Sequence, residues 1–88
     1  MKNWKLEPYQ GWKNYYTWNI ALFLNNDYGL YCAVKEYRDF CARQQVRMSY
    51  VGFLLFAGLD NCKTPDGVSF SSRHVCKQEI VNDVLKCD

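Results

Sequence analysis

Few residues of this 88-residue chain have the types and spacings that enzyme chemistry requires. Its single histidine, His74, stands near Ser71 and Ser72 in no recognisable nucleophile motif, and nucleophilic catalysis also needs a base and an orienting group. The nine carboxylates are scattered and form no pair at helix spacing of the kind that glycosidases or two-metal enzymes use. No phosphate-binding glycine loop and no HExxH motif is present. We therefore expect no enzymatic activity, and we expect His74 to be an exposed residue at the start of a helix.

Cysteines stand at positions 32, 41, 62, 76 and 87. On one helix, Cys32 and Cys41 would face opposite sides, and Cys76 and Cys87 would lie about 16 Å apart, beyond the reach of a disulfide. The odd count and the absence of a secretory signal favour reduced thiols. A zinc site of His74 with three of the cysteines is the alternative, but the C-x-x-C pair typical of structural zinc is missing. We expect no metal and no cofactor.

The composition is that of a globular domain, with 49% hydrophobic and 17% aromatic residues. The length allows one core, so residues 1–88 are expected to form a single domain. A net charge of +2 is far below the basic excess typical of nucleic-acid modules. The longest apolar stretch, residues 51–59, is shorter than the roughly 20 residues that span a bilayer, and no secretory signal precedes it. We expect a soluble cytoplasmic protein that does not contact membranes.

An aromatic arm and two helices are expected in the first half of the chain. Residues 1–16 should form an irregular or extended arm, which Pro8 and Gly11 interrupt. Thr17 stands where an N-cap should, directly before a first helix over residues 18–25. Asp27 can cap a second helix that runs to Arg43, because apolar residues recur there at three- and four-residue intervals.

The second half predicts two further helices separated by a turn. Residues 47–58 are apolar on all sides, so we expect a helix at the centre of the core, with a buried strand as the alternative. Residues 63–67 read Lys-Thr-Pro-Asp-Gly, which predicts a turn, and Ser71 or Ser72 would cap the last helix. The predicted fold is mostly α: a compact bundle of about four short helices with an aromatic N-terminal arm packed across it.

Residues 11–31 carry the pattern W-x-N-Y-x-T-W-N-x-x-L-x-x-x-N-D, and residues 64–68 read TPDGV. Both segments resemble those of a family of short, largely uncharacterised proteins found in bacteriophages, plasmids and bacteria. The resemblance implies no activity that can be assigned residue by residue. It implies a setting, namely a mobile genetic element that acts inside a bacterial cell.

In that setting we expect a non-enzymatic inhibitor, similar in style to an anti-CRISPR protein, which binds a host protein such as a defence nuclease or its complex and blocks it sterically. Aromatic side chains and arginines dominate the energetics of protein interfaces. The expected partner-binding residues are Trp4, Tyr9, Trp12, Tyr15, Tyr16, Arg38, Arg43, Arg47 and Arg73. Packing of the aromatic rings in a thin core is the competing interpretation of the arm.

Two other hypotheses remain open. One is a nucleic-acid-binding accessory protein, whose affinity would fall steeply with salt. It would use exposed aromatic rings with Lys2, Lys5, Lys13, Arg43 and Arg47. The other is self-association through an apolar surface, so the choice between monomer and homodimer stays open.

Overall fold

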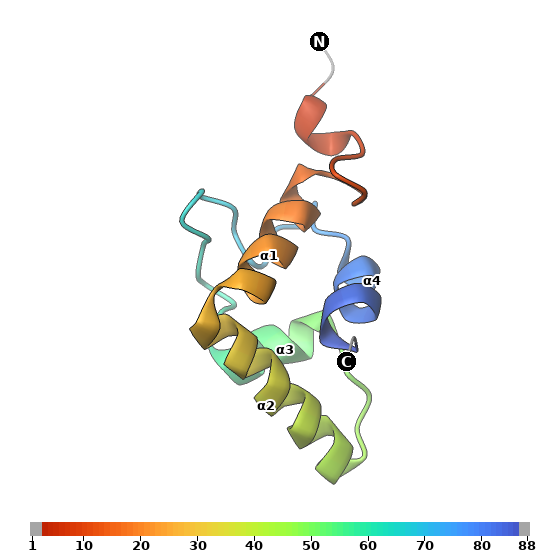
Figure 1. The fold of residues 1–88 in the computed structure, drawn as a ribbon, viewed down its shortest axis with the longest axis vertical. Helices are drawn as coiled ribbons and strands as arrows, with labels where there is room; N and C mark the ends of the chain where they lie inside the picture. Colours follow the sequence, from red (N-terminus) through yellow and green to blue (C-terminus); the bar gives the residue numbers. More distant parts are fainter. Residues whose placement is uncertain (1–2, 87–88) are drawn as a thin grey trace.

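The N-terminal segment folds into a single helical turn and a tight turn at one end of an elongated molecule (Figure 1). In the computed structural model, which describes residues 3–86, η1 (Trp4–Leu6) is a turn of 3₁₀ helix. Tyr9 and Trp12 then exchange two backbone hydrogen bonds of 2.9 and 2.8 Å. The two residues between them have positive φ angles of 50° and 85°, as in a type I′ turn. The segment expected to be irregular or extended therefore has local structure of its own.

Helices α1 (Tyr15–Asn26) and α2 (Tyr28–Gln44) are joined by Asp27 alone. The Asp27 N–H donates to the Phe23 carbonyl at 2.9 Å, and the Asp27 carboxylate accepts from the Leu30 N–H at 3.0 Å. One residue thus ends the first helix and caps the second, which confirms the predicted cap at Asp27.

The predicted cap of the first helix is wrong, because Asn14 and not Thr17 is the N-cap of α1. The side-chain oxygen of Asn14 accepts from the Thr17 N–H at 2.9 Å and from the Thr17 hydroxyl at 2.8 Å. The helix therefore begins at Tyr15, three residues earlier than predicted.

Residues Tyr50–Ala57 form helix α3, so the alternative of a buried strand is wrong. The Ser49 hydroxyl caps its start, and Gly58, with a φ of 71°, ends it in the left-handed conformation that glycine adopts without strain. The expectation that α3 lies at the centre of the core is also wrong. Three of its side chains, Tyr50, Phe53 and Leu54, are buried in the core, but three others are exposed, so the helix borders the core.

The last helix begins later than predicted. It consists of α4 (Lys77–Ile80), which continues directly into the π-helical turn η2 (Val81–Leu85). Its N-cap position is Cys76, so the prediction that Ser71 or Ser72 caps it is wrong. The Ser72 hydroxyl instead accepts from the His74 N–H at 3.2 Å, which holds a turn before the helix.

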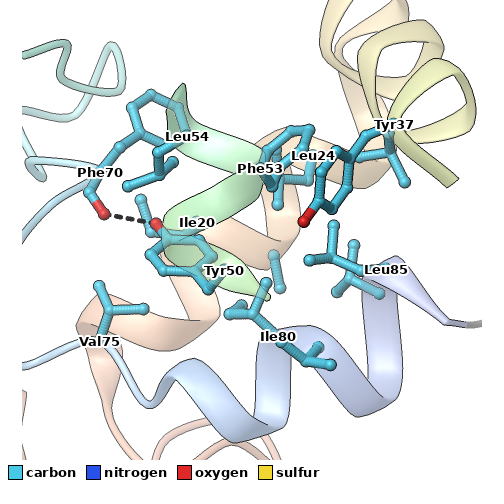
Figure 2. Packing of buried hydrophobic residues seen from close by; sticks show 14 of the residues in the cluster. Ile20, Leu24, Tyr37, Tyr50, Phe53, Leu54, Phe70, Val75, Ile80 and Leu85 are labelled. Atoms are coloured by element: carbon cyan, nitrogen blue, oxygen red, sulfur yellow. Dashed lines mark hydrogen bonds between the residues drawn. The ribbon is translucent and has the colours of Figure 1, made fainter. Parts of the chain in front are cut away.

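The core lies between α1, α2, α3 and the last helix (Figure 2). Side chains with no exposed surface include Ile20, Leu24, Phe53, Ile80 and Leu85. Tyr50 is almost fully buried beside them, and its hydroxyl donates to the Phe70 carbonyl. The predicted mostly helical bundle is confirmed, since residues 3–86 form four α-helices and no strand longer than an isolated bridge. None of these helices is both long enough and apolar enough to cross a membrane.

Candidate protein-binding surface

Four aromatic rings from η1, the following turn and α1 pack against one another and form what we call the aromatic tip: Trp4, Tyr9, Tyr15 and Trp18. Their ring centroids lie between 4.9 Å, for Tyr9 and Trp18, and 5.9 Å, for Trp4 and Tyr9. Most pairs are tilted or edge-to-face, which is the arrangement that aromatic quadrupoles favour. The tip is therefore a preorganised surface of rings.

The tip is only partly covered. Trp4 is 55% exposed, while the other three rings are half-buried. The Lys5 ammonium lies 5.9 Å from the Trp4 ring centroid and 5.6 Å from that of Tyr15, within the range of cation–π attraction. Burial, followed by the nearby Asp66 carboxylate, raises the pKa of the Tyr15 phenol, so this ring stays uncharged at neutral pH.

Trp12 and Tyr16, also predicted as partner-binding residues, lie outside the tip. Trp12 is half-buried and packs against the core. Tyr16 stacks on His74, with ring centroids 5.0 Å apart and an interplanar angle of 28°. His74 was expected to be exposed on a helix, but it is half-buried in the loop before α4 because Tyr16 covers its ring. The predicted set of binding residues does not include the tip residue Trp18. Its position directly after Thr17, the expected N-cap, indicated a residue of the first helix that packs in the core.

The four predicted arginines do not gather at the tip. Arg38 is half-buried, and its guanidinium donates from Nε to the Leu85 carbonyl at 2.9 Å, so it holds the end of the last helix. Arg43 is exposed in the last turn of α2, at the end of the molecule opposite the tip (Figure 1). Arg47 and Arg73 are exposed in the loops before α3 and before α4.

A second apolar surface, absent from the predicted set, lies on α2 and α3. It consists of Phe40, Leu55 and Phe56, whose side chains are 36%, 64% and 42% exposed, and we call it the α2–α3 patch. The Phe40 and Phe56 ring centroids lie 5.3 Å apart. The only signal for this patch in the sequence is that residues 50–57 are apolar on every face of the helix.

A shallow groove of about 380 Å³ lies between the start of α3 and the last helix. Met48, Tyr50, Val51 and Val81 supply its apolar lining. Arg47, Lys77 and Lys86 line it with positive charge, and no carboxylate of residues 3–86 does. Of the predicted binding residues, only Arg47 contributes to this groove.

Comparison with known proteins gives a family but no function. Residues 5–86 match DUF7249, a family of unknown function. The chain belongs to this family. No curated protein and no solved structure matches it.

In this DUF7249 chain, the polar residues of the two segments that suggested a resemblance form two hydrogen-bond networks. The Asn14 amide donates to the His74 carbonyl at 2.6 Å, and the Thr17 hydroxyl accepts from the Cys76 N–H at 2.8 Å. Because Asn14 and Thr17 are buried, their side chains join the start of α1 to the start of the last helix and are inaccessible to a partner.

The TPDGV segment bonds to α1 through the second network. Asn19, which is fully buried, donates to the Asp66 carboxylate at 2.8 Å and accepts from the Thr64 hydroxyl at 2.6 Å. The Gly67 N–H donates to the Thr64 carbonyl at 2.8 Å, and Gly67 has a φ of 87°, so the predicted turn is confirmed. In this DUF7249 chain the polar motif residues Asn14, Thr17, Asn19 and Thr64 therefore stabilise the fold, whereas Tyr15 and Trp18 of the first segment belong to the aromatic tip.

The remaining candidate chemistry concerns thiols and metals. Cys32, Cys41, Cys62 and Cys76 are free thiols. Residues 3–86 contain no group of three histidine, cysteine or acidic side chains that could hold a metal ion. Cys87, proposed for a zinc site, and Lys2, proposed for nucleic-acid contact, lie outside the described residues.

Proposed function

We propose that this protein is a non-enzymatic protein-binding protein whose contact surface is the aromatic tip. The observation that carries the proposal is the half-exposed Trp4 ring, held in place by ring contacts to Tyr9 and Tyr15. Trp and Tyr are the residues that most often dominate interface energetics. Rings that are already fixed lose little conformational freedom when a partner binds, which favours affinity.

We extend the proposal to the setting that the sequence resemblance implies. The protein would be encoded by a phage or plasmid, act in the cytoplasm of a bacterial host and block a defence nuclease or its complex sterically. The dimensions of 47 × 21 × 21 Å, with the tip at one end of the long axis, suit insertion into a cleft of such a partner (Figure 1).

The nucleic-acid alternative draws less support from the arrangement of charge. Its basic residues lie apart, since Lys5 is at the tip and Arg43 is at the opposite end of the molecule (Figure 1). Between them, the Lys13 N–H donates to the Glu79 carboxylate at 2.7 Å, which places negative charge beside it. A strand that stacked on the tip rings would not follow a continuous basic track.

The test is affinity capture from bacterial lysate with wild-type protein, Trp4→Ala and Tyr28→Ala. Tyr28 is 80% exposed and begins α2, so its removal is a matched loss of one exposed aromatic ring away from the tip. We expect a protein partner that survives nuclease treatment, binds the Tyr28→Ala variant and is lost or weakened at least tenfold with Trp4→Ala. A partner that disappears on nuclease treatment would support the nucleic-acid alternative, and equal capture by both variants would contradict the tip.

A further inference from the structure

The α2–α3 patch is distinct from the aromatic tip, and we infer that it is the surface through which two copies of this chain associate. The patch rests on a rigid base, because the buried Tyr37 ring lies 5.4 Å from Phe56 and 5.7 Å from Phe53. Phe40 and Phe56 therefore form a fixed apolar platform. Leu55, the residue before Phe56 on α3, is 64% exposed. An exposed apolar platform of this kind is typical of an interaction site.

The order of charges along α2 favours a second copy as the occupant. Glu36 lies one helical turn before Phe40 and Arg43 lies one turn after it. At about 100° per residue, these two side chains project about 40° and 60° from Phe40, on the same side of the helix. Both are exposed, and neither forms an ion pair within residues 3–86.

A two-fold axis perpendicular to α2, level with Phe40 and about 4–5 Å from the helix axis, would make this arrangement self-complementary. Two α2 helices would then run antiparallel, at the usual spacing of about 8–10 Å between packed helices. Glu36 would face Arg43 of the partner subunit, and the same pair would form a second time across the axis, as an isologous contact requires. Asp39 projects about 100° from Phe40 and would stay at the margin of the contact.

Such a dimer would leave both aromatic tips free. η1 lies at one end of the long axis, and the C-terminal half of α2 extends toward the opposite end (Figure 1). Self-association through the patch is therefore independent of the binding proposed for the tip, and variants of one surface should not affect the other.

The experiment is sedimentation velocity of the full chain over micromolar to several hundred micromolar concentrations, with circular dichroism to check folding. We expect a dimer for the wild type and for Trp4→Ala, and a monomer for Leu55→Asp, which places a charge on the most exposed side chain of the patch. Glu36→Arg would set arginine against arginine twice and weaken the dimer about tenfold. The double variant E36R/R43E restores opposite charges across the axis, so its dissociation constant should return to within about threefold of the wild type.

Three results would overturn the inference. The first is a wild-type chain that stays monomeric at every concentration. The second is a dimer that Leu55→Asp leaves intact, or that Trp4→Ala abolishes, since either would place the contact elsewhere. The third is a double variant as weak as Glu36→Arg alone, which would exclude the antiparallel pairing of Glu36 with Arg43.

Discussion

Thr17 joins the start of α1 to the start of the last helix through one hydroxyl. That hydroxyl donates to Asn14 and accepts from the Cys76 N–H, and the side chain has no exposed surface. Thr17→Val keeps the shape but leaves the Cys76 N–H without its partner, so we expect the free energy of unfolding to fall by about 1–3 kcal/mol. Thr17→Ser, which keeps the hydroxyl, should lose less in the same urea titration. A loss with Thr17→Val no larger than the loss with Thr17→Ser would contradict a dominant role of the hydroxyl.

Tyr50 should make the fold sensitive to alkali. Burial raises the pKa of its phenol above the usual value of 10.0, so the folded chain holds this proton more tightly than the unfolded chain does. The corresponding stabilisation is complete below pH 10 and is lost as the pH rises above that value.

Melting temperatures measured from pH 7 to 11 test this dependence against Tyr50→Phe. The variant should lose about 1–3 kcal/mol at pH 7, because the Phe70 carbonyl loses its donor. It should also decline less steeply than the wild type above pH 10. Other tyrosines with raised pKa values, such as Tyr37, contribute equally to both curves, and parallel curves would contradict the role of Tyr50.

At the scale of the element, Gly52 lets α3 approach α2. A Cβ atom at this position would lie 2.6 Å from the Tyr37 hydroxyl oxygen and 2.8 Å from the Ser49 Oγ. The Tyr37 hydroxyl cannot move freely, because it accepts from the Ser49 N–H at 3.1 Å and its ring is buried. We expect Gly52→Ala to destabilise the fold by about 1–3 kcal/mol in spite of the higher helix propensity of alanine. A gain in thermal stability would show that the two helices separate easily.

The helices were predictable where a local signal acts alone, and were misplaced where two signals compete. Asn25, Asn26 and Asp27 form a single polar break between two apolar runs, so a junction of α1 and α2 followed from the sequence. Asn14 and Thr17 can both cap a helix. Only the structure shows that the Thr17 hydroxyl donates to Asn14 and accepts from the Cys76 N–H. Ser72 likewise bonds the His74 N–H locally, which competes with helix formation.

The candidate surfaces were harder to predict than the helices, because burial depends on contacts between distant residues. Arginine is a residue type typical of interface anchors. The Arg38 guanidinium nevertheless donates to the carbonyl of Leu85, 47 positions away in the sequence. A helix that is apolar on every face, such as α3, gives no periodicity from which to tell its covered side from its exposed side. The expectation of an aromatic surface near the N-terminus named three of the four tip rings, namely Trp4, Tyr9 and Tyr15.

At the scale of the whole molecule, the residues before Tyr9 lie outside the core, whereas the tip rings of Tyr15 and Trp18 belong to α1, and Tyr15 packs against the core. No residue from Asn3 to Lys13 is buried, and η1 packs mainly on α1. We expect a chain lacking residues 1–8 to keep its helical circular dichroism and a cooperative thermal transition, while losing any partner that the tip binds. Loss of cooperative unfolding would instead show that the tip completes the core.

The hydrogen bonds that tie α1 to the later segments also constrain when this chain can fold. They join residues from 45 to 66 positions apart, including Asn19 with Thr64, Thr17 with Cys76 and Lys13 with Glu79. Contacts of such long separation form only after the entropy of closing the intervening chain has been overcome. During translation, α1 and α2 are complete many residues before their partners emerge from the ribosome. The apolar faces of the two longest helices, α1 and α2, therefore stay partly uncovered in the nascent chain until the last helix has been synthesised.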